Sequence, residues 1–356
     1  MDIRTLLGRL LESGGSDLHL KVGSPPIIRS QGQLVQMEGS PLGIEDTRRF
    51  ADELLTAEKR QQLSEEGDAE VARSFEGLGR YRVNAYLQRG VVGLVLRLVA
   101  TSIPTVADLN LPPIVESLAG ERRGLILVTG PAGTGKTTTI AAMIGTINRT
   151  RRCHVITLED PIEVLHRDEL ASIDQREVGS DILTYTDGLR YAVRQDPDVL
   201  FIGEIRDEAT AEAAVNAAET GHLVISTMHT INASETLNRF IDLFPADRQK
   251  QVRNSLAGSL LAVVCQRLIP RVDGWGRIPA VEVMVVNGRV ADLILAPGRA
   301  GQLSGIIEEG QSWGMQTFEA SLVELVRAGM ISSDEARVAA TNRHDFGLAL
   351  SKAALV

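Results

Sequence analysis

Cysteines and aromatic residues are scarce in this chain of 356 residues, and it has no long apolar run. Cys153 and Cys265 have neither a CxxC partner nor a histidine at metal-ligand spacing, so we expect reduced core thiols and no zinc site. No segment approaches the ~18 apolar residues of a membrane span, and the N-terminus lacks the apolar block of a signal peptide. We therefore expect any contact with a membrane to come from docking alone.

An excess of basic residues is also missing. Lys and Arg number 37 against 46 Asp and Glu, a formal net charge of −9. This balance argues against a nucleic-acid partner. Hydrophobic residues make up 44% of the chain, enough for large cores. The length predicts two domains with a small third element.

Three regions and a linker follow from the residue pattern. Residues 1–100 combine several alternating strands with a short amphipathic helix and a second helix over 44–63. Prolines within 101–113 indicate a linker. Residues 114–270 alternate short apolar runs with helical stretches, which is typical of an α/β fold with a mainly parallel sheet. We expect residues 271–356 to be mainly helical.

A glycine-rich segment follows the apolar run at 125–129 and fits the pattern G-x-x-x-x-G-K-[ST] of a P-loop. Its glycines let backbone N–H groups face phosphates, and the helix that follows adds a favourable dipole. We expect Lys136 to reach the β and γ phosphates of ATP and Thr137 to ligate Mg²⁺. The residues predicted to bind this cofactor are Gly130, Pro131, Ala132, Gly133, Thr134, Gly135, Lys136, Thr137 and Thr138.

Acidic side chains are expected at the carboxyl ends of neighbouring strands, where open parallel sheets bind ligands. One turn holds Glu159 and Asp160, predicted metal ligands, and Glu163, predicted to orient the attacking water. A second apolar strand ends in Glu204, which predicts the general base. Most P-loop enzymes place an Asp before this Glu, but Gly203 stands here. The structural alternatives are a solvated acidic turn and a Glu that caps a helix.

Histidines and arginines complete the candidate site. His229 follows the carboxyl end of a third apolar strand, so we expect it to contact the γ-phosphate. His222 precedes the same strand, which leaves both cofactor binding and a structural role open. Arg82 and Arg97 fall on consecutive strands of the N-terminal region. An arginine from a neighbouring subunit can stabilise transition-state charge; the alternative for each is a surface salt bridge.

Together these motifs resemble the secretion ATPases of the type II secretion and type IV pilus superfamily, and within it the PilT-like retraction ATPases of twitching motility. The resemblance covers about residues 3 to 340. The segments that carry it are 16–20, 79–85, 130–137, 157–163, 196–207, 218–224, 228–230 and 314–317.

The resemblance implies a PAS-like α+β N-terminal domain, a RecA-like ATPase domain and a helical C-terminal region. It also implies a homohexamer in which Arg82 and Arg97 reach toward the nucleotide. Such a motor is cytoplasmic and docks at the inner face of the cytoplasmic membrane on a PilC-like platform protein. ATP hydrolysis then drives the withdrawal of pilin subunits from the pilus.

Two absences favour the retraction branch, and one departure qualifies it. The chain begins almost directly at the PAS-like part, and segment 268–279 lacks the four-cysteine zinc motif usual in extension ATPases. The family's C-terminal retraction motif falls on 289–296, but Ala291 and Leu295 replace its two arginines and Pro297 interrupts it. A PilU-like accessory role beside a paralogous ATPase, or a pilus extension or type II secretion role, therefore stays open.

Overall fold

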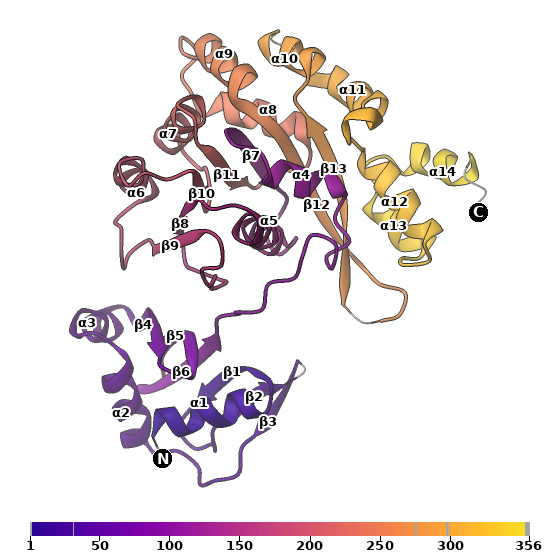
Figure 1. Ribbon diagram of the computed structural model, residues 1–356. Helices are drawn as coiled ribbons and strands as arrows, with labels where there is room; N and C mark the ends of the chain where they lie inside the picture. The colour runs from indigo at the N-terminus through magenta and orange to yellow at the C-terminus, as the bar shows by residue number, and fades with distance from the viewer. Residues whose placement is uncertain (1, 31, 275, 297, 299, 353–356) are drawn as a thin grey trace. The chain divides into compact units, whose positions relative to one another are not determined.

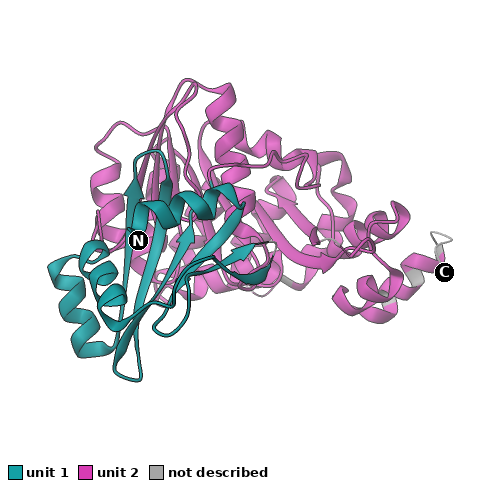
Figure 2. Ribbon diagram, turned by 90° about the horizontal axis from the view of Figure 1, so that it is seen from below, with its two compact units in different colours: residues 1–100 teal, residues 101–356 magenta. Residues whose placement is uncertain are grey.

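The chain folds into two compact units, residues 1–100 and residues 101–356, each with its own hydrophobic core (Figures 1 and 2). The computed structural model describes residues 2–30, 32–274, 276–296, 298 and 300–352. No helix in these segments is long and apolar enough to cross a membrane.

The first unit is an antiparallel sheet with helices against one face. Its strand order is β3-β2-β1-β6-β5-β4. Alternate strand residues such as Leu18, Tyr81 and Leu96 pack with Leu6 and Phe50 of the helices. The elements are α1 (Ile3–Glu12), β1 (Gly15–Leu20), β2 (Ile27–Ser30), β3 (Gln33–Gln36), α2 (Ile44–Leu54), α3 (Ala57–Glu66), β4 (Asp68–Phe75), β5 (Gly79–Gln88) and β6 (Val91–Leu98).

The single helix predicted over 44–63 is two helices. Leu55 is extended and ends α2. The Thr56 side chain then accepts a hydrogen bond from the backbone N–H of Lys59 and begins α3. A threonine at this position is a favourable N-cap, so a local side-chain contact starts the second helix.

The second unit contains a seven-stranded sheet of order β13-β12-β7-β11-β10-β8-β9. All neighbouring pairs are parallel except β12 and β13. Every residue of β7, β10 and β11 is buried because helices cover both faces. Helices α4 and α5 pack on one face and α6 to α9 on the other (Figure 1). The elements are α4 (Pro113–Ala119), β7 (Gly124–Thr129), α5 (Lys136–Thr150), β8 (His154–Glu159), β9 (Ser172–Glu177), α6 (Tyr185–Ala192), β10 (Val199–Ile202), α7 (Glu208–Glu219), β11 (Leu223–Met228), α8 (Ala233–Asp242), α9 (Gln249–Ser259), β12 (Leu260–Pro270) and β13 (Arg277–Val285).

We expected the chain to be mainly helical after Arg271, but the structure has a long strand, β13, in this region. This strand pairs with β12 along its whole length and is almost entirely buried, so its apolar run lacks a strand's usual alternation. Val283 and Gln316 exchange backbone hydrogen bonds of 2.9 and 3.1 Å, which attach the C-terminal segment to the sheet. The elements that follow β13 are α10 (Gly288–Leu295), η1 (Ala300–Gln302), α11 (Leu303–Glu309), η2 (Gln311–Trp313), α12 (Phe318–Arg327), α13 (Ser333–Ala339) and α14 (Arg343–Lys352).

The predicted fold class is confirmed: a P-loop α/β unit follows an antiparallel α+β unit, and helices dominate the C-terminal segment. Both cysteines are free thiols, as expected. Cys265 is buried in the second unit, and Cys153 is partly buried.

Candidate functional site

The glycine-rich loop joins the carboxyl end of β7 to the first turn of α5. Gly130, Gly133 and Gly135 all have positive φ angles, which favour glycine. A Cβ at Gly130 would lie 2.6 Å from both the Gln266 carbonyl oxygen and the Thr134 hydroxyl. No side chain caps α5, so the N–H groups of its first turn stay available to an anion. The loop therefore has the shape and the open donors that a phosphate chain requires.

Lys136 places its ammonium group over this loop. Its Nζ donates hydrogen bonds to the carbonyl oxygens of Gly130 at 2.7 Å and Pro131 at 3.0 Å. Burial lowers the pKa of Lys136, and the carboxylates of Glu204 and Glu163 act in the opposite direction. Both predicted catalytic carboxylates therefore lie close enough to Lys136 for their charges to act on it. A cation beside two acids suits a site where phosphate charge must be balanced.

His229 connects Lys136 with Glu204. Its Nδ1 lies 3.4 Å from the Lys136 Nζ, and its Nε2 lies 3.3 Å from Oε1 of Glu204. Both contacts are satisfied when Nε2 carries the proton of a neutral ring, because Nδ1 then accepts and Nε2 donates. Arg206 holds the other carboxylate oxygen of Glu204 at 2.6 Å. The structure thus brings together the predicted phosphate-binding lysine, general base and histidine.

The acidic turn after β8 contains one buried and two exposed carboxylates. Glu159 is 6% exposed, and its Oε1 accepts hydrogen bonds from Thr157 at 2.7 Å and Gln175 at 3.0 Å. Burial raises the pKa of Glu159. Asp160 and Glu163 are exposed. Asp160 is thus the more accessible of the two metal ligands predicted in this turn.

Few protein side chains are available as metal ligands at the predicted Mg²⁺ site. Thr137, in the first turn of α5, lines a small cavity that Glu159 also lines. In the described part of the chain, no group of three or more His, Cys, Asp and Glu side chains is arranged to hold a metal ion. Mg²⁺ commonly binds through one or two protein groups, substrate phosphates and waters. The residues present fit a Mg²⁺ that arrives with a nucleotide, and Thr137 and Glu159 stay predicted ligands together with Asp160.

His222 does not lie at the phosphate site of its own chain, and we correct that prediction. It precedes Leu223, which pairs with Gly124 at the amino end of β7, whereas the P-loop follows the carboxyl end. A strand rises about 3.3 Å per residue, so the length of β11 separates His222 from His229. The Nδ1 of His222 contacts the Ala217 carbonyl oxygen at 2.9 Å, in the last turn of α7. Within its own chain this contact supports the structural alternative.

Arg82 and Arg97 lie directly opposite each other on β5 and β6, on the sheet face away from the helices of the first unit. Arg82 pairs with Glu70 at 3.0 Å, and Arg97 pairs with the buried carboxylate of Asp17 at 2.7 Å. Hydrogen bonds from Ser16 and Arg97 hold the pKa of Asp17 below its usual range although burial opposes them. Each arginine is therefore in a salt bridge within its own unit, and the action of either on a nucleotide stays a prediction.

Comparison with known proteins places this site in a family. Residues 105–297 match the family described as Type II/IV secretion system protein. The type IV pilus ATPase PilU of Pseudomonas aeruginosa is 40% identical over 98% of this chain and 91% of its own length. The type IV pilus retraction ATPase PilT of the same organism is 38% identical over 95% of this chain and 97% of its own length.

A solved structure agrees with these relatives. The crystal structure of the pilus retraction motor PilT with bound ADP superimposes with a TM-score of 0.88 at 40% sequence identity, covering 97% of this chain and 98% of that chain. The chain belongs to the type II/IV secretion ATPase family. As an ATPase of this family it binds nucleotide, for which the P-loop described above provides the cradle.

The segment at the position of the family's retraction motif forms α10. Asn287 caps this helix, and Val290, Leu293 and Ile294 are buried. Leu295 is 45% exposed, and Ala291, one turn earlier, is partly exposed. The two positions at which the resemblance predicts arginines therefore lie on the outer side of α10, apart from the residues that pack it. Pro297 lies outside the described residues.

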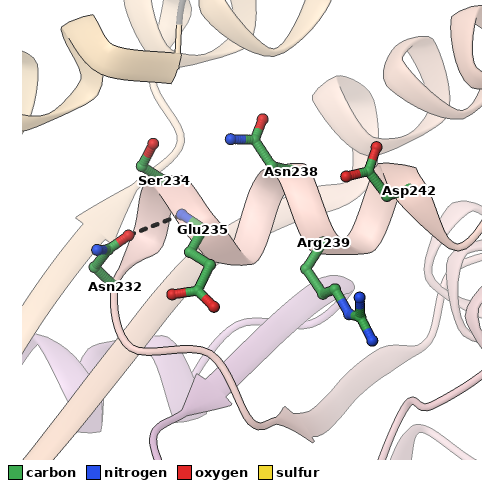
Figure 3. Close-up of a pocket in the computed structure, with 6 residues that line it drawn as sticks. All are labelled: Asn232, Ser234, Glu235, Asn238, Arg239 and Asp242. Atoms are coloured by element: carbon green, nitrogen blue, oxygen red, sulfur yellow. Dashed lines mark hydrogen bonds between the residues drawn. The ribbon is translucent and has the colours of Figure 1, made fainter.

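A polar pocket runs along α8, the helix that follows the segment bearing His229. Figure 3 shows its lining, with the side chain of Asn232 accepting a hydrogen bond of 2.8 Å from the backbone N–H of Glu235. The residues predicted to bind nucleotide or Mg²⁺, or to catalyse hydrolysis, do not line this pocket. The lining residues are Asn232, Ser234, Glu235, Asn238, Arg239 and Asp242.

Arg206, which the sequence places two residues after Glu204 as a further candidate arginine, forms a salt bridge with that carboxylate. One other side chain beside Glu204 was not predicted. Tyr185 opens α6, and its ring lies over Gly203. The available sequence signal was Gly203, which stands where most P-loop enzymes have an Asp. A glycine at this position leaves space that the side chain of another residue, here Tyr185, can fill.

Proposed function

We propose that this chain is an ATP-hydrolysing motor for the retraction of type IV pili. The observation that carries the proposal is the match to PilT with bound ADP over 97% of the chain, together with the P-loop that meets its geometric requirements here. The relatives named PilT and PilU, each covered over more than nine tenths of its length, support the same function.

In this proposal each side chain at the P-loop edge has one task. Lys136 leaves its carbonyl partners and binds phosphate oxygens. The Glu204 carboxylate accepts a proton from the attacking water, and Glu163 orients that water. His229 contacts the γ-phosphate position and links it to Glu204. Mg²⁺, held by Thr137 and the acidic turn, would balance phosphate charge when bound.

The assembly is part of the proposal. A homohexamer would let Arg82 and Arg97 of one subunit stabilise charge at a neighbour's nucleotide. The ring would dock on a PilC-like platform protein at the inner face of the cytoplasmic membrane. No DNA or RNA partner is required.

A PilU-like accessory motor is the second candidate. The outer side of α10 supports it, since Ala291 and Leu295 replace the arginines of the retraction motif, and PilU is among the relatives. In that role the chain would hydrolyse ATP but act on pili only beside a paralogous ATPase. Pilus extension and type II secretion remain further alternatives.

The test combines an ATP-hydrolysis assay on purified protein with a gene deletion scored for pili on the cell surface. Purified protein should hydrolyse ATP with Mg²⁺, and Lys136→Ala should abolish turnover without lowering the melting temperature. Wild-type protein inactive even with its platform protein would overturn the ATPase role. Deleting the gene should give hyperpiliated cells that do not twitch. Bald cells would indicate extension, and a defect seen only when a paralogue is also weakened would indicate the accessory role.

A further inference from the structure

The position before Glu204, where most P-loop enzymes carry an Asp, is filled in this structure by a residue from another element. A Cβ built on Gly203 would lie 2.5 Å from the hydroxyl oxygen of Tyr185 and 3.2 Å from the carbonyl oxygen of Leu158. Contacts shorter than 3.0 Å are not tolerated without movement. The phenol therefore occupies the space that an Asp side chain would need.

Tyr185 is held firmly in this place. It is the first residue of α6, whose N-cap Thr184 accepts a hydrogen bond from the backbone N–H of Asp187 at 3.1 Å. Its ring packs against the hydrophobic cluster on this face of the sheet. Local capping and apolar packing thus fix the ring, and the direction of its hydroxyl follows.

The hydroxyl lies beside Gly203, the residue directly before Glu204. Across the described residues it makes no hydrogen bond. The charges of Asp160, Arg206 and Glu204 all act on it. Burial is the main cause that raises the pKa of Tyr185, so the group is a neutral phenol at physiological pH. A neutral hydroxyl can both donate and accept, which suits a water molecule as its partner.

We propose that the Tyr185 hydroxyl takes over the positioning task of the missing Asp, by hydrogen bonding to a water in the shell of the nucleotide-bound Mg²⁺. The inference rests on the proposed function, because it requires the nucleotide and the ion at the P-loop. A phenol can place a water but adds no negative charge. The charge that an Asp would supply therefore comes from Glu204 and the acidic turn.

Tyr185→Phe tests this directly, because it removes the hydroxyl and keeps the ring over Gly203. The measurement is the affinity for a fluorescent ADP analogue with and without Mg²⁺, which requires no turnover. We expect unchanged affinity without Mg²⁺ and an about fivefold smaller gain when Mg²⁺ is added, the effect of one lost hydrogen bond. Tyr191→Phe is the matched control, since Tyr191 lies on the same helix and is 55% exposed.

A second pair of variants tests whether the Tyr185 side chain occupies the space that an Asp at position 203 would need. Gly203→Asp alone should weaken the Mg²⁺ gain and lower the melting temperature, because its Cβ meets the phenol. Adding Tyr185→Ala vacates that space, so the double variant should regain the Mg²⁺ gain, while the lost packing of the ring keeps its melting temperature low. A loss of Mg²⁺ gain that is merely additive would count against a shared position. An unchanged Mg²⁺ gain in Tyr185→Phe would overturn the inference. Wild-type protein that does not bind the analogue would instead overturn the proposed function.

Discussion

The two ends of strand β11 carry histidines in very different surroundings. At the carboxyl end His229 lies between the Lys136 ammonium and the Glu204 carboxylate, 3.4 and 3.3 Å from them. At the amino end His222 contacts the Ala217 carbonyl oxygen and the Thr220 hydroxyl. The same residue type therefore contacts reactive groups at one edge of a parallel sheet and supports a helix end at the other.

The largest expected effect lies at the carboxyl edge. Glu204→Gln keeps the shape of the side chain but removes the base that takes the water's proton. We expect kcat to fall by ~10²–10⁴, the usual contribution of general acid–base catalysis. Steady-state hydrolysis and nucleotide affinity are the measurements, and affinity should change little. A variant that retains half of the wild-type kcat would remove Glu204 from this role.

The two histidines can be compared directly. We expect His229→Gln to lower kcat about tenfold, because one hydrogen-bonded contact to the carboxylate is lost. His222→Gln should leave kcat unchanged and lower the free energy of unfolding by ~1 kcal/mol, through its contact with α7. Hydrolysis rates and chemical denaturation measure both variants. An equal loss of kcat in both variants would contradict the difference proposed between the two edges of the sheet.

A third test concerns pH at the amino edge, where His154 begins β8. Burial lowers the pKa of His154, but Asp174 at 2.9 Å and two backbone carbonyl oxygens outweigh it and raise the pKa above 6.5. Its stabilisation is therefore complete below the unfolded-state pKa and is lost as pH rises through the folded-state pKa. The melting temperatures of wild type and His154→Gln should differ more at pH 6 than at pH 8.5. In an Asp174→Asn background this pH dependence should become smaller, because only the backbone carbonyl oxygens still raise the pKa of His154.

The smallest effect on the enzyme itself is expected at α10. Placing arginines at both altered positions, Ala291→Arg with Leu295→Arg, changes only the outer side of the helix. We expect kcat to stay at the wild-type level and the free energy of unfolding to change by less than about 0.5 kcal/mol. Twitching by cells that carry the double variant is the informative measurement. Improved twitching would show that these positions contact the retraction machinery, and an unchanged rate would remove them from it.

These comparisons show how far the sequence could predict the site. Lys136 was predictable from the P-loop spacing between β7 and α5. Glu204 and His229 were predictable because they come just after the buried strands β10 and β11, and strand ends converge at one edge of a parallel sheet. His222 failed the same reasoning, since seven residues along a strand carry a side chain to the opposite edge. His222 and His229 are close in the sequence, but this closeness does not show how far an extended strand separates their side chains.

Other features depend on contacts between distant segments. The strand β13 has no clear alternation because both of its faces are buried. Tyr185 and Gly203 are brought together only by the packing of α6 against the sheet, although the glycine itself marked an unusual position. The pairing of Arg97 with Asp17 across 80 residues likewise requires the sheet of the first unit.

The attachment of the C-terminal segment to β13 has a practical consequence for cutting the chain. Beyond the Val283–Gln316 hydrogen bonds, the Arg267 guanidinium lies 3.9 Å over the Phe318 ring and donates a hydrogen bond of 2.6 Å to the Ala339 carbonyl oxygen. The family match ends at residue 297, before either partner. A fragment ended there would leave Arg267 partly buried without its partners and strip apolar cover from β12 and β13. We therefore expect a fragment that folds stably to extend beyond residue 297, where the family match ends.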